Sequence, residues 1–440
     1  MLAVGNRQGR RAAPSRGAGG AAAALTAALL ALMLVAGCSA PPSETSEGEA
    51  PQTEFGTVGD EPGSSSAAGP NAAQGASPAK PGPTLDERAA EKTAALTLEQ
   101  KVAQLFVVRP EAITGVDTVT QAGSATQEAL RAYPVGGVVY FQKNLLTADQ
   151  TEKMIANSQA YAQEACGLPL FVGVDEEGGT VSRVGGNPGF AVPNAGNMAD
   201  VGATGDPTQA RAAAQTIGGY LHDLGFNVDF APDADICGDP AVDVMALRSF
   251  GGDPALVGSM VAAQVEGFSK AGVLCAAKHF PGIGGVPGDS HEGAIVSDKT
   301  LDELRAWELA PFEAAIEAGV PLVMVGHLSA PNATGNDVPA SINPVVVTDL
   351  LRGELGFEGL VITDSMGMGA VDGFCTPDQA GVAALQAGVD LVLMPTDFAA
   401  AYQGVLDAVR SGALPESRVD ESVARIAKAK LALSEVRPAP

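Results

Sequence analysis

The stretch Val273-Leu-Cys-Ala-Ala-Lys278-His-Phe-Pro-Gly282 places a lysine and a histidine directly after an apolar run, and Asp289-Ser-His291 follows shortly afterwards. Together the two segments hold two of the four histidines of the chain. A continuous apolar run is typical of a strand buried on both faces. Polar residues crowded past the end of such a strand indicate the catalytic face of an α/β enzyme, although an ordinary solvated loop is the alternative.

Short apolar runs of the same kind recur along the whole chain. The segments between them are long enough for crossover helices, and capping-box patterns open at Thr97 and Thr300. The second pattern predicts one helix that includes Trp307 and ends at Gly319. Eight strands alternating with helices favour an α/β fold of the (β/α)₈ TIM-barrel type over a doubly wound sheet. The eight runs are residues 105–108, 137–141, 170–174, 228–231, 273–277, 322–325, 360–363 and 391–394.

A polar residue follows each of the eight runs. Because the carboxyl ends of parallel barrel strands share one face, we expect these residues to converge around one mouth. In chain order they are Arg109, Gln142, Asp175, Asp233, Lys278 with His279, His327, Asp364 and Asp397.

The N-terminal residues predict export from the cell. Four arginines precede the uncharged residues 17–36, and small residues lead up to Cys38. This order describes a secretory signal peptide, residues 1–37. The residues before Cys38 resemble the lipobox of bacterial lipoproteins, which implies a lipidated Cys38 thiol and an extracytoplasmic protein anchored to the outer face of the cytoplasmic membrane. A transmembrane anchor is the alternative, since the segment is long enough to span a bilayer.

Two regions follow the signal segment. Residues 38–83 are rich in Ser, Gly, Pro, Ala and Glu, and Phe55 is the one aromatic residue among them. They cannot bury a core and are expected to form a flexible tether. Residues 84–440 remain for the catalytic barrel domain, a normal length for this fold.

Charge and cysteine content narrow the classes of partner. The net charge of -25 argues against a nucleic-acid partner bound through a basic surface. Four cysteines remain beside Cys38, too few for a disulfide framework in so large a domain. Cys275 lies in a predicted strand and is expected to be a packed thiol. Whether Cys237 and Cys375 pair is left open.

Several of these residues suit catalysis or ligand binding. A carboxylate such as Asp364, at a strand-to-helix turn, fits either a helix N-cap or a nucleophile. Asp175 precedes the pair Gly178-Gly179, which permits close backbone approach to a ligand but also fits a tight turn. Lys278, beside a buried strand, needs a partner or a ligand.

Ordered motifs along the expected barrel resemble those of glycoside hydrolase family 3, and within it the single-domain β-N-acetylglucosaminidase (β-N-acetylhexosaminidase) branch. The resemblance covers essentially the whole barrel domain. The matching stretches are Leu96-Thr-Leu-Glu-Gln-Lys-Val-Ala-Gln-Leu105, Asp175-Glu-Glu-Gly-Gly179, Asn227-Val-Asp-Phe-Ala-Pro232, Lys278-His-Phe-Pro-Gly282, Asp289-Ser-His291, Thr363-Asp-Ser-Met366, Ala387-Gly-Val-Asp-Leu-Val-Leu-Met394 and Arg425-Ile426.

The resemblance implies a retaining hydrolase that releases terminal β-linked N-acetylglucosamine from cell-wall-type or chitin-type saccharides. Asp364 is then the nucleophile, and His291 the general acid/base with Asp289 as its partner. The chemistry agrees, because a carboxylate attacks the anomeric carbon and a histidine, with its ordinary pKa of about 6.5, serves as both acid and base near neutrality. The residues implied to hold the sugar are Asp175, Arg183, Arg248, Lys278 and His279.

Two positions depart from the branch and bear on sugar preference or loop movement. Ile283 stands where a second histidine is usual, and Thr180 stands where an arginine is common.

Other functions are compatible with parts of this sequence. A β-glucosidase or β-xylosidase of the same family is the nearest alternative, and some relatives transfer the sugar to phosphate. No cofactor is expected. A metal-dependent barrel hydrolase would need clustered ligands, and the chain contains neither His-x-His nor His-Glu-x-x-His, so no metal is expected. A lipoprotein that binds wall glycans without turnover is the alternative of another class.

Overall fold

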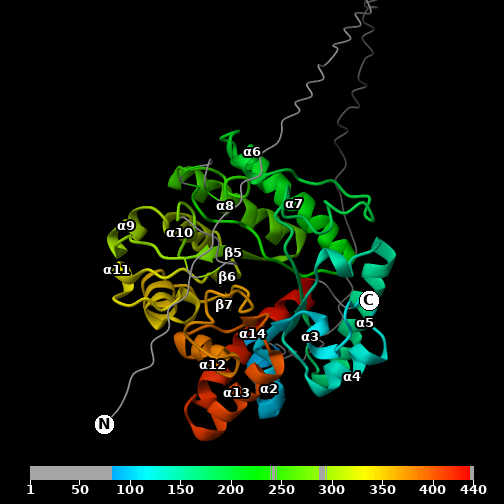
Figure 1. Cartoon of the computed structure of the whole chain (residues 1–440). Coiled ribbons are helices and arrows are strands. Elements are labelled where there is room, and N and C mark those ends of the chain that lie inside the picture. Colours follow the sequence, from blue (N-terminus) through cyan, green and yellow to red (C-terminus); the bar gives the residue numbers. More distant parts are fainter. Residues whose placement is uncertain are drawn as a thin grey trace, which may run out of the picture. The chain divides into compact units, whose positions relative to one another are not determined.

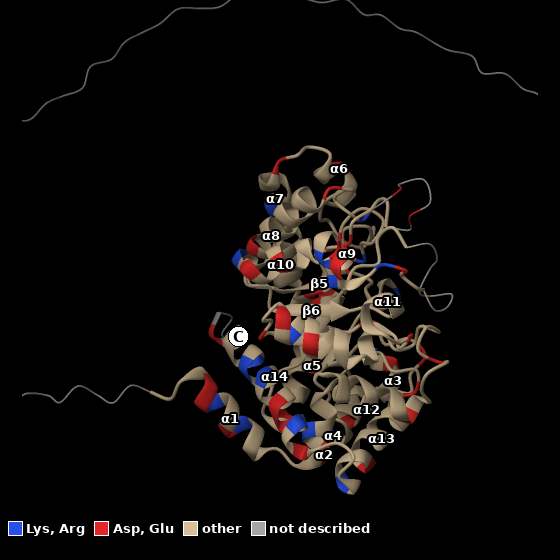
Figure 2. Ribbon diagram, turned by 90° about the vertical axis from the view of Figure 1, so that its left-hand side faces the viewer, with Lys and Arg blue, Asp and Glu red and all other residues tan. Residues whose placement is uncertain are grey.

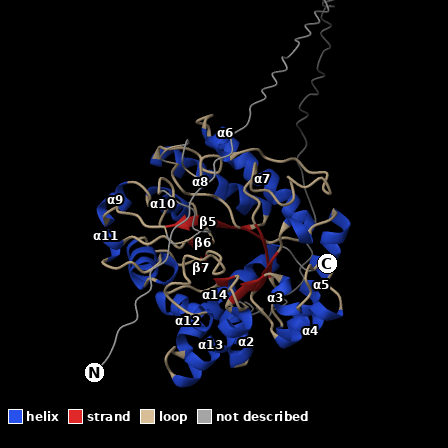
Figure 3. Cartoon of the chain, viewed as in Figure 1, coloured by secondary structure: helices blue, strands red, loops and turns tan. Residues whose placement is uncertain are grey.

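The part of the chain that the structure describes forms a ring of parallel strands surrounded by helices (Figures 1 and 3). The computed structural model describes residues 82–237, 239, 243, 245–286, 293 and 295–436. Successive strands pair in parallel, β1 also pairs with β8, and a parallel bridge between Ile362 and Leu391 joins β7 to β8. The predicted (β/α)₈ barrel is therefore confirmed. The strands are β1 (Phe106–Val108), β2 (Gly137–Val139), β3 (Phe171–Val174), β4 (Val228–Asp229), β5 (Leu274–Phe280), β6 (Leu322–Val325), β7 (Leu360–Thr363) and β8 (Val392–Leu393).

Helices fill the crossovers between the strands. The α-helices are α1 (Leu85–Ala95), α2 (Leu98–Gln104), α3 (Pro110–Thr114), α4 (Ser124–Ala132), α5 (Ala148–Cys166), α6 (Met198–Gly202), α7 (Pro207–Leu224), α8 (Pro254–Ala271), α9 (Leu301–Ala306), α10 (Ala310–Glu317), α11 (Pro331–Thr334), α12 (Pro377–Ala387), α13 (Phe398–Ser411) and α14 (Glu416–Val436). Three further helical segments are η1 (Gln142–Asn144), η2 (Ala340–Ile342) and the π-helix η3 (Val345–Glu354), which connects β6 to β7.

All eight predicted runs contain a strand, but the fifth strand is longer than its apolar run. The run ends at Ala277, whereas β5 continues to Phe280. Lys278 forms a parallel bridge with Asp233, and the pairing register with β6 shifts between Ala277 and Phe280. Lys278 and His279 are both buried. The expectation that they lie in a loop beyond the strand was wrong, because backbone pairing continues where the apolar pattern stops.

The helix predicted from Thr300 is two helices. The capping box is present, since the Thr300 hydroxyl accepts from Glu303 N and the Glu303 side chain accepts from Thr300 N. However, α9 ends at Ala306, and Trp307 is exposed. Pro311, in the first turn of α10, explains the break, because it has no N–H to donate to the carbonyl of Trp307 and its ring would clash there.

The four cysteines within the described residues are free. Cys275 is buried in β5, as predicted. Cys237 and Cys375, whose pairing the sequence left open, are not bonded to each other. Cys237 is buried after β4, whereas the Cys375 thiol is half-buried 3.9 Å from the carbonyl oxygen of Val371.

Apolar side chains fill the barrel below its mouth. Val107, Phe171, Val228 and Phe230 lie there, and a Cβ added to Gly173 would meet Phe230 Cε2 at 2.9 Å. The interior is therefore a packed core, which confines any ligand to the mouth.

The C-terminal helix α14 is tied to the first two helices by ion pairs. Lys101 of α2 lies 3.1 Å from Glu416 and 2.7 Å from Asp420 of α14. Lys428 of α14 lies 2.6 Å from Asp86 of α1. Basic and acidic residues consequently lie side by side on these three helices (Figure 2).

The segments that carry the export prediction, residues 1–37 and Cys38, lie outside the described residues. Within the described part of the chain, no helix combines the length and apolar character needed to cross a bilayer.

Lys430 of α14 is completely buried at the amino-terminal end of the barrel. Its Nζ donates to Gln104 Oε1 at 2.7 Å and lies 5.0 Å from the centroid of Phe171, the first residue of β3. No carboxylate bonds to it among the described residues, and burial lowers the pKa of Lys430 to about 7. The native protein therefore binds fewer protons than the unfolded chain above that pH.

We predict that Lys430→Met removes a pH dependence of stability. An unfolded lysine titrates near pH ~10.4, so the wild type should gain on the order of 4 kcal/mol relative to the variant as the pH rises from about 7 to 10. Urea unfolding at several pH values measures this. Lys428→Met, on the exposed face of the same helix, controls for loss of a lysine. A wild-type-minus-Lys430→Met difference that stays constant with pH would contradict the assignment.

Candidate active site

Three consecutive acids follow β3, and two of them bind Lys278 of β5. Lys278 Nζ lies 3.1 Å from Asp175 Oδ1 and 2.6 Å from Glu177 Oε1. The lysine side chain is only 3% exposed, so its charge requires these partners. Burial lowers the pKa of Lys278, but the charges of Glu177 and Asp175 outweigh it and raise the pKa above its ordinary value. The lysine is therefore a fixed positive charge.

Arg248, from the segment after β4, shares Glu177 with that lysine. Its Nε and Nη2 each lie 2.7 Å from an oxygen of Glu177, a bidentate arrangement. Its Nη2 also lies 3.5 Å from Asp233 Oδ2. Burial would raise the pKa of Glu177, but Lys278 and Arg248 lower it to about 2. One ionised carboxylate thus holds both cations.

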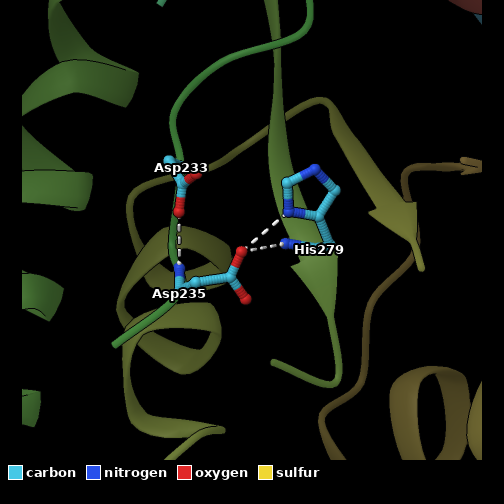
Figure 4. Close-up of side chains that lie close together, drawn as sticks. All are labelled: Asp233, Asp235 and His279. Atoms are coloured by element: carbon cyan, nitrogen blue, oxygen red, sulfur yellow. Dashed lines mark hydrogen bonds and ion pairs between the residues drawn. The ribbon is translucent and has the colours of Figure 1, made fainter. Parts of the chain in front are cut away.

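His279 is oriented by Asp235 (Figure 4). The ring Nδ1 lies 2.7 Å from Asp235 Oδ2, and the other carboxylate oxygen accepts from Ile283 N at 2.7 Å. Asp235 N donates to Asp233 Oδ1 at 3.0 Å. Burial alone would lower the pKa of His279, but the charge and hydrogen bond of Asp235 raise it above its ordinary value. A doubly protonated ring directs Nδ1–H at Asp235 and keeps Nε2–H for another acceptor.

Asp364 follows β7 directly, at the same end of the barrel. Its backbone N donates to Val325 O of β6 at 2.8 Å, and Ser365 N donates to its Oδ1 at 2.7 Å. The described segment 364–376 contains no helix start, and α12 begins at Pro377. The carboxylate is therefore not a helix N-cap, which was one of the two roles its position suggested.

The charge state of Asp364 is set by neighbouring cations. Burial would raise the pKa of this carboxyl, but the positive charges of His279, His327 and Lys278 and the bond from its neighbouring amide lower it below its ordinary value. Asp364 is consequently ionised at neutral pH, the state that a nucleophile needs.

His327, after β6, holds the backbone that follows Asp364. Its Nε2 lies 2.9 Å from Ser365 O and its Nδ1 lies 2.7 Å from Ser341 Oγ. Since a carbonyl oxygen only accepts, Nε2 carries a proton there, and the charged ring also donates from Nδ1 to the Ser341 hydroxyl oxygen. Two serines thus fix the orientation of a buried imidazole beside the carboxylate.

Arg183 lies at the end of the loop that follows the three acids. Its guanidinium carbon is 6.0 Å from the ring centroid of Phe141, just past β2. Its Nε is buried and has no hydrogen-bond partner among the described residues. The side chain therefore keeps a donor available.

Residues 97–429 match the N-terminal domain of glycosyl hydrolase family 3. The chain belongs to glycosyl hydrolase family 3.

Curated relatives in the family include two beta-hexosaminidases. Beta-hexosaminidase A of Pseudoalteromonas piscicida is 35% identical over 333 residues, which cover 70% of this chain but only 55% of that protein. The chain thus spans about half the length of that relative. Beta-hexosaminidase LpqI of Mycobacterium tuberculosis is 36% identical over 377 residues, covering 82% of this chain and 91% of that protein.

A solved structure supports the same family and fold. The glycoside hydrolase family 3 beta-N-acetylglucosaminidase from Paenibacillus sp. str. FPU-7 is 38% identical with a TM-score of 0.71, over 78% of this chain and 62% of that one.

Most of the predicted strand-end residues of this family 3 barrel interact with one another, but not all of them do. Arg109 and Gln142 are exposed, and Asp397 is exposed where it caps α13 by accepting from Ala400 N at 3.0 Å. Within the described part of the chain, the side chains of these three form no hydrogen bond or ion pair with the other strand-end residues, so their convergence stays a prediction. The residues linked by direct contacts or by their charges are Asp175, Asp233, Arg248, Lys278, His279, His327 and Asp364.

Asp289 and His291 lie outside the described residues. Their assignment as the acid/base pair stays a prediction from the resemblance.

Sequence reasoning missed the residues that hold the predicted ones. Glu177 lay inside a quoted motif, and the requirement that Lys278 have a partner was the available signal for it. Asp235 had no such signal, because its contact with His279 spans 44 positions in the chain. Ser341, the partner of His327, was missed for the same reason.

Asp233, Asp235 and His279 are the group among the described residues whose ligand atoms lie within 4.8 Å of one another, as a bound cation would need. In this structure these candidate ligand atoms already interact with protein groups. His279 Nδ1 and Asp235 Oδ2 bond to each other, and Asp233 Oδ2 faces the Arg248 guanidinium. The donor set does not fit a metal without breaking these pairs, so we derive no metal-dependent step.

We predict that Asp235→Asn lowers the pKa of His279. The amide NH₂ would donate to Nδ1, which favours the neutral ring. In the wild type the raised pKa contributes stability that is complete below the unfolded value of about 6.5 and is lost as the pH rises through the folded value. NMR titration of the ring and unfolding at pH 5 to 9 measure both effects.

Asp397→Asn is the matched control for this variant. It makes the same chemical change at a strand end outside the charged cluster, and asparagine is an equally good N-cap. Identical His279 titrations in Asp235→Asn and in the wild type would show that Asp235 does not set the charge of the ring.

Proposed function

We propose that this chain is a retaining β-N-acetylhexosaminidase that releases terminal β-linked N-acetylglucosamine through a covalent glycosyl-Asp364 intermediate. The observation that carries the proposal is the position of Asp364, directly after β7, where its backbone bonds to β6 and Ser365 N donates to its carboxylate. The neighbouring charges of His279 and Lys278 lower the pKa of this carboxyl. The beta-hexosaminidase names of the relatives in this family support the sugar.

The reaction would proceed in two displacements. The Asp364 carboxylate attacks the anomeric carbon while the bond to the leaving oxygen breaks, and His291 protonates that oxygen. In the second step His291 removes a proton from water, which attacks the same carbon and releases Asp364. The imidazole and the carboxylate each return to their starting state, so no cofactor is consumed.

The described charges suit binding of the sugar in this scheme. Lys278 uses two of its three donors on carboxylates, and the His279 ring keeps Nε2–H. Hydroxyl groups of a sugar accept from such donors. Asp175 is half-buried and bound on one oxygen by Lys278, so its second oxygen can accept from a hydroxyl.

The natural substrate and the location are part of the proposal. We propose cell-wall-type or chitin-type saccharides outside the cytoplasm, with the protein held at the membrane by lipid on Cys38. The support is the sequence of the N-terminal segment alone.

Asp364→Asn should reduce kcat/KM on an aryl β-N-acetylglucosaminide by at least about 1000-fold, equivalent to roughly 4 kcal/mol, because a neutral amide is a poor nucleophile. His291→Ala should lose rate most with poor leaving groups. Asp397→Asn is the matched control and should keep nearly full activity.

A slow 5-fluoro glycosyl fluoride of N-acetylglucosamine should add one sugar mass to the peptide that contains Asp364. A label on another residue would refute the nucleophile assignment. Free N-acetylglucosamine is the expected product in phosphate buffer. A sugar 1-phosphate product would show that the enzyme is a phosphorylase and not a hydrolase.

Cys38→Ala should move the protein from the membrane fraction to the soluble fraction of a bacterial host and abolish labelling by an alkyne fatty acid. Cys375→Ala, which removes a half-buried thiol of the barrel, should leave both unchanged. Continued fatty-acid labelling of Cys38→Ala would rule out the lipobox assignment.

A further inference from the structure

Glu176, the middle acid of the three that follow β3, points away from the charged cluster. Its neighbours Asp175 and Glu177 both contact Lys278, whereas the Glu176 side chain faces the loop at residues 182–185 and is fully buried. We propose that Glu176 is a positioning residue that shapes this loop and thereby sets where Arg183 meets the sugar. The inference rests on the proposed function, in which Arg183 binds the substrate.

One carboxylate gathers five hydrogen bonds from the loop and from α7. Oε1 accepts from Ser182 Oγ at 2.5 Å, from Gly185 N at 2.8 Å and from Tyr220 OH at 2.7 Å. Oε2 accepts from Arg183 N at 2.5 Å and from Val184 N at 2.8 Å. Three consecutive backbone N–H groups that converge on one anion form the concave arrangement known as a nest.

The five bonds explain how a carboxylate is tolerated at zero exposure. Both oxygens are saturated, which offsets the cost of removing the charge from water. Burial and the charge of Glu176 raise the pKa of Tyr220, so its hydroxyl stays protonated and donates. With no free lone pair directed at the mouth, Glu176 has no role as a proton donor or as a ligand for substrate.

The surrounding backbone is built to close around this carboxylate. Gly178 and Gly179 have positive φ angles of 97° and 55°, and Gly178 and Val181 bond to each other in a tight turn that reverses the chain. A Cβ on Gly185 would lie 3.1 Å from Glu176 Oε1 and 2.9 Å from Pro193 O. The loop therefore fits tightly against the carboxylate.

Arg183 is the residue of this loop that binds the sugar under the proposed function. Its backbone N is fixed by Glu176 at 2.5 Å, while its side chain lies against Phe141 with a buried Nε that has no partner in the described part of the chain. A buried donor without a partner is costly, and a sugar oxygen would satisfy it. A shift of the backbone at Arg183 would move that donor out of register with the substrate.

Glutamine cannot replace the carboxylate in this nest. The amide presents one oxygen and one NH₂, and the NH₂ would face either the two N–H donors now on Oε2 or the three donors on Oε1. Glu176→Gln keeps the size of the side chain and should therefore loosen residues 183–185 specifically.

The test is a double-mutant cycle on an aryl β-N-acetylglucosaminide. Arg183→Ala should lower kcat/KM by about 10- to 100-fold, the usual range for one hydrogen bond to a charged group. Glu176→Gln alone should lower it by about 10-fold, mainly through KM. In the Arg183→Ala background, Glu176→Gln should cost less than about 3-fold, because its effect passes through the missing side chain.

Amide hydrogen exchange gives a readout that needs no substrate. Exchange at residues 183–185 should accelerate in Glu176→Gln and remain unchanged in Glu164→Gln, a matched change at an exposed glutamate that bonds Gln127 and Arg131. If Glu176→Gln does not fold, Tyr220→Phe removes one of the five donors and should cost about 2- to 5-fold, again only when Arg183 is present.

Losses that multiply in the double variant, or wild-type kinetics in Glu176→Gln, would overturn the positioning role. A wild type that does not hydrolyse the glucosaminide would instead refute the proposed function. In that case unchanged exchange at residues 183–185 would still overturn the loop-shaping role, and accelerated exchange would support it.

Discussion

The mouth of the barrel depends on one carboxylate, Glu177, which holds one buried cation, Lys278, and one half-buried cation, Arg248. Lys278 arrives from β5 and Arg248 from the segment after β4, and both bond to Glu177 at 2.6–2.7 Å. Like charges brought this close repel each other, and burial deprives them of water. The ionised acid between them offsets both costs. The cations are consequently placed by a requirement of folding before any substrate is present.

Two further acids near this cluster, Asp229 and Asp233, are buried. Burial raises the pKa of Asp229 well above its ordinary value, and burial together with the charge of Asp235 does the same for Asp233. A raised pKa favours the neutral acid, which limits the negative charge near Lys278 and Arg248. Asp229 Oδ1 still accepts from Glu176 N at 2.9 Å, so this acid also ties β4 to the segment that carries the site.

The sequence predicted the barrel because strands buried on both faces must be apolar along their length, and every such run contains a strand. The apolar pattern gave the wrong element boundaries at two places, where something other than apolar burial sets the end of the element. β5 continues beyond its apolar run through Lys278 and His279, whose buried side chains are paired with acids. Pro311 divides the predicted helix into two, although the apolar pattern continues. Asp235 and Ser341 could not be paired with their histidines from sequence, because those contacts exist only after the barrel closes.

The three acids after β3 have two different roles, which follow from the alternation of side chains along an extended chain. Successive side chains of such a chain point to opposite sides, so the first and third acids face Lys278 while Glu176 faces the loop. One short segment thus neutralises a cation on one side and folds the loop that carries Arg183 on the other. Asp175 and Glu177 keep their register with Lys278 only if the backbone between them stays extended. The five hydrogen bonds to the Glu176 side chain hold that conformation. Because Glu176 lies between Asp175 and Glu177, the loop and the charged cluster stabilise each other through this residue.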